Sequence, residues 1–387
     1  MVIKNGRVVT PFGIEEKDIR IEHGVIAELG TGLEGGEEID AQGCLVTPGF
    51  IDIHTHGGYE CDFMDCTEEA FERALKFHLD NGTTTVVPTS CTAPRESIVR
   101  FLAFAREYMA AEHESARVAG VHLEGPFLSV KNRGAQKLEQ LAVPARDDYS
   151  YMLEYADVIR TVTISPELEG AAEMTKALTE RGIVVSGGHD DGIYPEFIPA
   201  VEAGLSHLTH LYCAMSDLRF KDGRRNVGLR EYALIDDGLT AEIIMDNHHI
   251  TPELARMIVR CKGARRVCVV SDSLRCAGQP KDGRVYKLGS DEDAVRFVIG
   301  DGVAVVENSA TYAGSITPVR AMVKNLIDAG LPVADAVRMG TLTPAEVIGV
   351  SSTRGSLEVG KLADICILDD SFDLKKVFVG GRAVTKG

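Results

Sequence analysis

The chain has 387 residues, of which 44% are apolar, and a formal net charge of −17. This length suits one large barrel with an accessory domain, and the acidic balance argues against a nucleic-acid or anionic-membrane surface. The apolar runs are too short to span a membrane, and the N-terminus does not resemble a signal peptide. The nine cysteines have neither the spacing of a disulfide framework nor that of a zinc knuckle. We therefore expect a cytoplasmic protein.

Short strands and turns are predicted at both ends of the chain. Neither end has enough apolar residues to form a core alone, so we predict that residues 1–46 and 354–387 pair into one small β-sandwich domain formed from both termini. The predicted strands are Val2–Ile3, Arg7–Val9, Asp18–Glu22, Val25–Ile26 and Ala363–Leu368, followed by a hairpin over Val377–Val384.

Between these ends, residues 47–353 alternate between predicted strands and helices. Eight such units indicate a closed (β/α)8 TIM-like barrel rather than an open doubly wound sheet. After Gly278 a polar, glycine-punctuated excursion reaches about Gly314 and precedes two more helices. The candidate strands are Phe50–Ile53, Thr84–Pro88, Val118–Leu123, Ile159–Ile164, Ile183–Ser186, His207–Leu211, Ala241–Met245 and Val267–Val270. Helices are predicted between most of them, including Glu68–Asn81, Arg95–Glu112, Gly170–Arg181 and Pro252–Lys262.

The first barrel strand ends in two histidines, within the sequence P-G-F-I-D-I-H-T-H-G from Pro48 to Gly57. Side chains two residues apart on a strand share a face, so His54 and His56 can bind one metal ion together. Alternatively, one or both histidines could be barrel residues that only form hydrogen bonds and bind no metal. Their position, after an apolar strand and before a glycine loop, favours a metal site.

Other predicted strands also end in imidazole or carboxylate side chains. In a (β/α)8 barrel these strand ends form the catalytic face, so the side chains converge on one rim. Each alone would be weak evidence, because most strand-end acids are caps and most lone histidines are structural. Mixed nitrogen and oxygen ligands suit zinc, iron, cobalt or manganese rather than calcium. The residues are Glu124, His189, His207, His210, Asp246, His248, His249 and Asp272.

Several motifs resemble those of the amidohydrolase superfamily and, within it, the N-acetylglucosamine-6-phosphate deacetylases. Beside the first-strand motif they are H-L-E-G-P-F at 122–127, G-H at 188–189, T-H-L-Y-x-A-M at 209–215, Asp-x-x-His at 246–249, S-D-S at 271–273 and A-G-S at 313–315. The resemblance runs nearly end to end and implies a barrel of the metal-dependent hydrolase type. It also implies hydrolysis of N-acetylglucosamine 6-phosphate to glucosamine 6-phosphate and acetate, in amino-sugar catabolism.

The resemblance further implies a homodimer with one or two divalent ions per subunit, zinc being the first expectation and iron, cobalt or manganese the others. Three residues would hold a core metal and the first-strand pair a second metal beside it. The expected ligands are Glu124, His189 and His210 for the first metal, and His54 and His56 for the second.

Catalytic and substrate-binding roles are implied in the same way. Asp272 would be the general base and acid, because a carboxylate beside a metal-activated water can take its proton and return it to the leaving nitrogen. His249 would contact the substrate near the scissile amide. Arg225 would reach the substrate phosphate of a neighbouring subunit, although Arg219, Lys221 or Arg224 could serve instead. The remaining expected substrate-binding positions are Gln136, Cys213 and Ala214.

Three departures from the deacetylase pattern bear on the substrate. Cys213 stands where the family usually has Asn, Arg225–Gly228 reads R-N-V-G instead of R-E-P-G, and N-S-A-T-Y precedes Ala313. These leave open a related substrate such as N-acetylgalactosamine 6-phosphate. A cyclic amide fits the deacetylase motifs less well, and a barrel that binds a sugar phosphate without turning it over would not need Asp272 beside the metal.

The remaining histidines carry weaker predictions. His207 and His248 could be packing residues or substrate contacts. His23, His78 and His113 are expected to be surface or helix histidines without a function.

Overall fold

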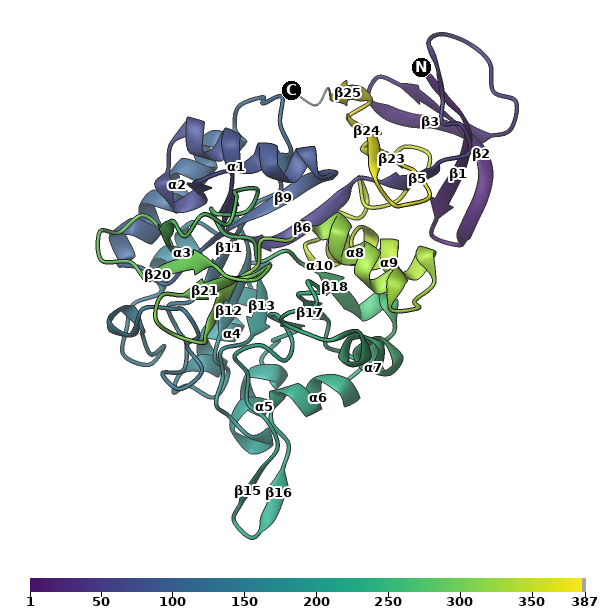
Figure 1. The fold of residues 1–387 in the computed structure, drawn as a ribbon. Helices are drawn as coiled ribbons and strands as arrows, with labels where there is room; N and C mark the ends of the chain where they lie inside the picture. Colours follow the sequence, from purple (N-terminus) through teal and green to yellow (C-terminus); the bar gives the residue numbers. More distant parts are fainter. Residues whose placement is uncertain (385–387) are drawn as a thin grey trace.

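Strands from the two ends of the chain form one sheet, drawn in purple and yellow in Figure 1. The computed structural model describes residues 1–384, so residues 385–387 of the predicted terminal domain lie outside the described residues. The strands are β1 (Val2–Thr10), β2 (Gly13–Glu22), β3 (Val25–Gly30), β4 (Glu38–Asp40), β5 (Leu45–Pro48), β23 (Ile365–Leu368), β24 (Leu374–Val379) and β25 (Arg382–Val384). Their order is β25-β24-β23-β5-β1-β2-β3, with β4 also paired to β1. β5 joins the two ends, because it lies parallel to β1 and antiparallel to β23.

This β-rich unit has a hydrophobic core of its own, separate from that of the barrel, which includes Val8, Ile19, Ile26, Val46 and Phe378. The prediction of two short strands before residue 10 was wrong. They are one strand, because the chain absorbs a register shift between Ile3 and Gly6, with a φ of 56° at Asn5, without leaving the sheet.

The predicted domain boundary after residue 46 falls inside β5, because that strand continues to Pro48. We propose Gly49, between β5 and the first barrel strand, as the division. The other boundary, before residue 354, stays a prediction.

Eight further strands form the barrel, so the predicted fold class is confirmed. They are β6 (Phe50–Thr55), β9 (Thr83–Ser90), β11 (Val121–Glu124), β12 (Ile159–Ile164), β13 (Val184–Gly187), β14 (His207–Leu208), β17 (Ala241–Ile243) and β18 (Val267–Val269). Neighbours from β6 to β14 pair in parallel, as do β17 and β18. Backbone hydrogen bonds join the remaining edges: Leu211 N donates to Glu242 O at 2.8 Å, and Asp272 N donates to His54 O at 2.9 Å. The strand ends therefore meet around one axis.

The end of the sixth strand and the helices after Gly314 differ from the prediction. The sixth strand ends at Leu208 rather than Leu211, because the chain turns at His210, whose φ is 27°. Three helices rather than two follow Gly314, because the chain breaks at Gly340 and Thr341 before the last of them.

The helices lie around the barrel strands (Figure 1). Side-chain caps fix some of their starts: Thr67 Oγ1 accepts from Ala70 N at 3.2 Å before α1, and Thr251 Oγ1 accepts from Leu254 N at 3.3 Å before α7. The α-helices are α1 (Glu68–Asp80), α2 (Arg95–Met109), α3 (Ser150–Glu154), α4 (Ala171–Thr179), α5 (Tyr194–Glu202), α6 (Leu229–Ile235), α7 (Pro252–Lys262), α8 (Val319–Asp328), α9 (Val333–Met339) and α10 (Leu342–Val347). Short 3-10 helices are η1 (Phe63–Asp65), η2 (Leu138–Gln140) and η3 (Ala264–Arg266).

Several shorter strands lie outside the eight barrel strands. The predicted polar excursion contains an antiparallel sheet of β19 (Val285–Lys287), β20 (Arg296–Ile299), β21 (Ala304–Val306) and β22 (Tyr312–Gly314). A hairpin of β15 (Arg219–Lys221) and β16 (Arg224–Asn226) projects from the bottom of the molecule in Figure 1. The others are β7 (Gly57–Gly58), β8 (Cys61–Asp62) and β10 (Arg117–Val118). Among residues 1–384, no helix has both the length and the apolar character needed to cross a membrane.

Candidate metal centre and active site

Glu124, at the end of β11, faces two histidines from neighbouring strands. Its Oε1 lies 3.0 Å from His189 Nε2 and 3.1 Å from His210 Nε2, and the two nitrogens are 3.1 Å apart. All three side chains are buried, and their ligand atoms face one point. One carboxylate oxygen and two imidazole nitrogens in this arrangement suit a divalent transition metal.

A second buried group lies beside the first and contains His54, His56 and Asp272. Asp272 Oδ1 is 3.2 Å from His56 Nε2 and 3.6 Å from His54 Nε2. His54 Nε2 is buried and has no hydrogen-bond partner among the described residues. This unpaired nitrogen, together with a second imidazole and a carboxylate, fits a divalent cation. Only a proton-transfer role was expected for Asp272, and the geometry also puts its carboxylate within reach of a metal.

The carboxylate of Glu124 lies between the two groups. Its Oε1 is 3.6 Å from His54 Nε2, and its Oε2 is 3.4 Å from His56 Nε2. Gln136 Nε2 donates to Glu124 Oε2 at 2.5 Å, and Gln136 Oε1 accepts from Thr92 N at 2.7 Å. Gln136 lines the cavity, as expected of a substrate-binding residue, and it also fixes the orientation of Glu124.

The electrostatics of the centre favour positive charge. Burial opposes ionisation of Glu124, yet hydrogen bonds from His189 and His210 outweigh it and hold the pKa of Glu124 well below its usual range. Burial lowers the pKa of His56, yet hydrogen bonds to Asp272 and Glu124 raise that pKa to about 10. The same negative charges that stabilise an imidazolium ring here would stabilise a bound cation.

Backbone turns at the strand ends direct the ligand side chains into the centre. His189, His210 and Asp272 have φ values of 50°, 27° and 45°, a region that residues other than glycine seldom occupy. Strain of this kind persists only where surrounding contacts impose it, and it clusters at functional sites.

Both groups open into a cavity of about 490 Å³, a size that suits a sugar phosphate. Cys213 and Ala214, both predicted to bind substrate, line it, as does His249. His249 Nδ1 lies 2.8 Å from Asp246 Oδ2, so this carboxylate orients the ring and leaves Nε2 to face a substrate.

Comparison with known proteins gives the family. Residues 45–384 match the model of the Amidohydrolase family. The chain belongs to the amidohydrolase family. Enzymes of this family depend on metal ions, which agrees with the two groups described above.

Relatives of this amidohydrolase align over most of its length. An N-acetylgalactosamine-6-phosphate deacetylase of Escherichia coli O157:H7 is 30% identical over 98% of both chains. An N-acetylglucosamine-6-phosphate deacetylase of Vibrio furnissii is 33% identical over 87% of this chain and 82% of its own. The solved structure of a mutant N-acetyl-D-glucosamine-6-phosphate deacetylase from Mycobacterium smegmatis, in complex with N-acetyl-D-glucosamine-6-phosphate, is 28% identical, with a TM-score of 0.88 over 100% of this chain and 99% of the other.

Arg225 lies apart from the cavity within this amidohydrolase chain. It is exposed on the β15–β16 hairpin, which projects away from the barrel (Figure 1). The three basic residues that could replace it, Arg219, Lys221 and Arg224, do not line the cavity either. Arg219 and Lys221 pair with Asp191 and Glu196.

Two basic residues that were not predicted from the sequence, Lys131 and Arg133, do line the cavity. They lie in the loop after β11, outside every motif that pointed to the site. Position in the fold is therefore the signal that identifies them.

One buried residue beside the centre was also missed. Glu242 lies inside the barrel and contacts His54 and His207, which gives His207 a supporting rather than a substrate-contacting position. His78 lies on α1, as expected of a helix histidine, and it is buried against β6, where its Nε2 is 3.0 Å from Thr55 Oγ1. Burial lowers the pKa of His78 to about 3, so it is neutral. His248 is exposed and does not line the cavity.

Proposed function

We propose that this amidohydrolase removes the acetyl group of N-acetylglucosamine 6-phosphate, giving glucosamine 6-phosphate and acetate in amino-sugar catabolism. The observation that carries the proposal is that Glu124, Asp272 and three of the four ligand histidines line one sugar-sized cavity, with the fourth, His54, buried behind them. The names of the relatives and the ligand of the Mycobacterium smegmatis enzyme support the same substrate.

The proposed ligand sets are the two described above, with zinc as the metal in both. Imidazole and carboxylate ligands suit zinc best, and iron, cobalt or manganese would bind the same donors. When bound, a divalent cation lowers the pKa of a water molecule and polarises the acetamido carbonyl.

The side chains of the protein supply the proton transfers. Asp272 accepts a proton from the attacking water and then donates it to the departing nitrogen, which makes the amine a better leaving group. His249, held by Asp246, would contact the acetamido oxygen through Nε2, and an Nε2–H on this ring stabilises the negative charge that develops there by donating a hydrogen bond to it. Burial of both side chains in the cavity wall keeps bulk water from competing for these contacts.

We further propose a cytoplasmic homodimer in which Arg225 of one subunit reaches the phosphate bound by the other. The exposed position of Arg225 on a projecting hairpin supports this, because within its own chain it does not line the cavity. Lys131 and Arg133 are the basic residues that would approach the phosphate from the same chain.

The proposed function is tested by acetate release from a panel of N-acetylated hexosamine 6-phosphates and their unphosphorylated forms. N-Acetylglucosamine 6-phosphate should give the highest kcat/KM, and removal of its phosphate should raise KM. A preference for N-acetylgalactosamine 6-phosphate would correct the sugar and keep the reaction. No release from any member would overturn the proposal.

A further inference from the structure

Glu242 is a carboxylate inside the barrel to which the proposed reaction gives no part. It lies on β17 between Ala241 and Ile243, and alternation along the strand directs it to the opposite face from these two residues. Its side chain is 1% exposed. Burying an ionised carboxylate is unfavourable unless charged or hydrogen-bonding partners compensate, so the contacts of Glu242 indicate what it does.

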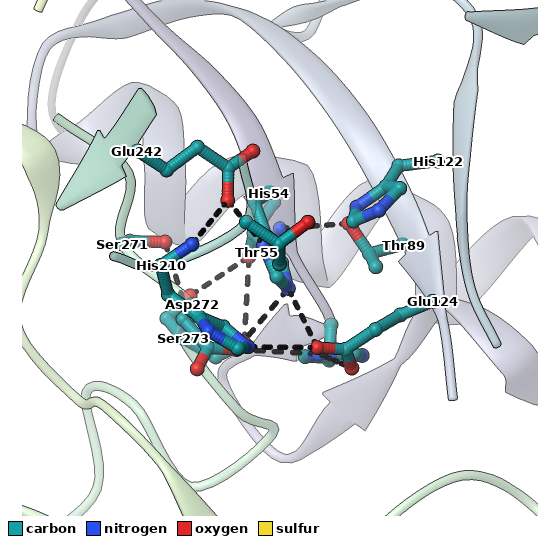
Figure 2. A network of polar contacts seen from close by, with 12 residues as sticks. His54, Thr55, Thr89, His122, Glu124, His210, Glu242, Ser271, Asp272 and Ser273 are labelled. Carbon is teal, nitrogen blue, oxygen red and sulfur yellow. Dashed lines mark hydrogen bonds and ion pairs between the residues drawn. The ribbon is translucent and has the colours of Figure 1, made fainter. Parts of the chain in front are cut away.

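One oxygen of Glu242 contacts a member of each ligand group, as Figure 2 shows. Oε2 lies 2.9 Å from His54 Nδ1 and accepts a hydrogen bond from the backbone N–H of His210 at 3.1 Å. The other oxygen, Oε1, is 3.3 Å from His207 Nε2. His54 and His210 come from the first and sixth barrel strands, so they share Glu242 although they are far apart in the sequence.

We propose that Glu242 is a positioning residue that holds His54 and His210 in place as metal ligands. By accepting from His54 Nδ1–H it selects the tautomer whose Nε2 has a free lone pair, and this is the atom that faces Asp272 and Glu124. By accepting from His210 N it restrains a backbone with a φ of 27°. A carboxylate behind a ligand imidazole also makes the imidazole a stronger ligand.

This inference rests on the metal centre proposed above, but not on the sugar that the enzyme takes. In the first test, metal-free enzyme is titrated with zinc, and calorimetry measures the number of equivalents bound and the affinity of each. Wild-type enzyme should bind two equivalents. In Glu242→Gln the amide oxygen can still accept from His210 N, but the charge behind His54 is gone, so the equivalent held by His54 should bind about 10- to 100-fold more weakly. Excess zinc should restore both the second equivalent and kcat.

A control separates positioning from the general effect of losing a buried carboxylate. Asp364, 5% exposed, lies in the terminal β-rich unit away from the metal centre. Asp364→Asn should leave both zinc affinities unchanged. Glu242→Asp keeps the charge but retracts it by one methylene, and it should also weaken one equivalent. This second variant serves if Glu242→Gln does not fold.

A double variant tests whether Glu242 influences zinc affinity through His54. In His54→Gln one equivalent should be lost. Adding Glu242→Gln should change the affinity of the remaining equivalent less than about threefold, because the action through His54 is already absent and the amide oxygen still accepts from His210 N. Unchanged zinc affinity in Glu242→Gln, equal losses in Asp364→Asn, or a single equivalent in wild type would overturn the proposal. If Glu242→Gln weakens zinc binding as expected but the wild-type enzyme releases no acetate, the result counts against the proposed substrate and not against the role of Glu242.

Discussion

His189 and His210 present their Nε2 atoms to each other at 3.1 Å, from the ends of β13 and β14. The pairing of these strands, in which Gly187 lies beside Leu208, brings the two rings together across a sequence separation of 21 residues. Among residues 1–384, Glu124 has the carboxylate nearest to both rings, so the three side chains form one ligand set. The two proposed metal positions can therefore be tested independently.

Removing the first-strand histidines should differ from removing His189. A His54→Gln, His56→Asn double variant should lose one metal and keep the Glu124 group occupied, with lower but measurable activity. His189→Asn should lose activity entirely, because it strips the metal that activates water. Elemental analysis paired with kinetics distinguishes these results. If both variants are equally inactive and metal-free, a single shared site replaces the two.

Asp272→Asn should lower kcat by about 10²- to 10⁴-fold, because the amide cannot shuttle the proton. Its Oδ1 lies 3.2 Å from His56 Nε2, so metal content must be measured in the same preparation. Asp282→Asn, an exposed change on the loop before β19, is the matched control and should keep wild-type kinetics. Activity of Asp272→Asn within a few-fold of wild type would exclude this residue as the proton shuttle.

Arg225→Ala should raise KM for the phosphorylated substrate by about 10- to 100-fold, since a charge-assisted hydrogen bond contributes about 1.5–3 kcal/mol. KM for the unphosphorylated sugar should not change. Asp222→Asn, an exposed change at the turn of the same hairpin, is the control. If Arg133→Ala gives the larger effect, the phosphate is held by its own chain.

Tyr312 offers the substrate an aromatic surface. Its side chain is 42% exposed in the cavity wall, and its ring lies 5.0 Å from that of His249. Tyr312→Leu should raise KM about 2- to 10-fold through lost ring contact, whereas Tyr312→Phe should stay near wild type. Equal KM values for all three proteins would show that the ring does not contact the sugar.

Glu167 should make stability depend on pH. Burial and the nearby Asp190 raise its pKa from 4.5 to about 8, so the folded state favours the protonated form. Its stabilising contribution is fully present below pH 4.5 and is lost as the pH rises to about 8. Glu167→Gln mimics the protonated acid at every pH. The melting temperature of the variant minus that of wild type should therefore increase as the pH rises from 4.5 to 8. Exposed Glu173→Gln is the control, and a constant difference for Glu167→Gln would contradict this assignment.

Most of the centre could be located from the sequence because its residues sit at strand ends inside short motifs. His54, His56, Glu124, His189 and Asp272 could each be found in this way, and barrel closure brings them together. These are local signals, and the order of the strands in the barrel is enough to predict that the residues lie close together.

The supporting residues had no such signal. Glu242 is one acidic residue in a short apolar strand, and only closure of the barrel, in which Leu211 N donates to Glu242 O, shows that it contacts three histidines. The sheet of β19–β22 was also missed, because its strands have three or four residues and turns interrupt any alternation. Contacts made across the fold decide both features.

The position of β5 between β1 and β23 has a consequence for synthesis of the chain. Residues 45–48 leave the ribosome more than 300 residues before Ile365–Leu368, so until these later residues emerge β5 has an open hydrogen-bonding edge. Open strand edges recruit other chains, and nascent proteins with late-arriving partners aggregate readily. Arrival of Ile365–Leu368 is therefore the event that covers this edge of β5, and a shortened chain ending before residue 365 would keep the edge open permanently.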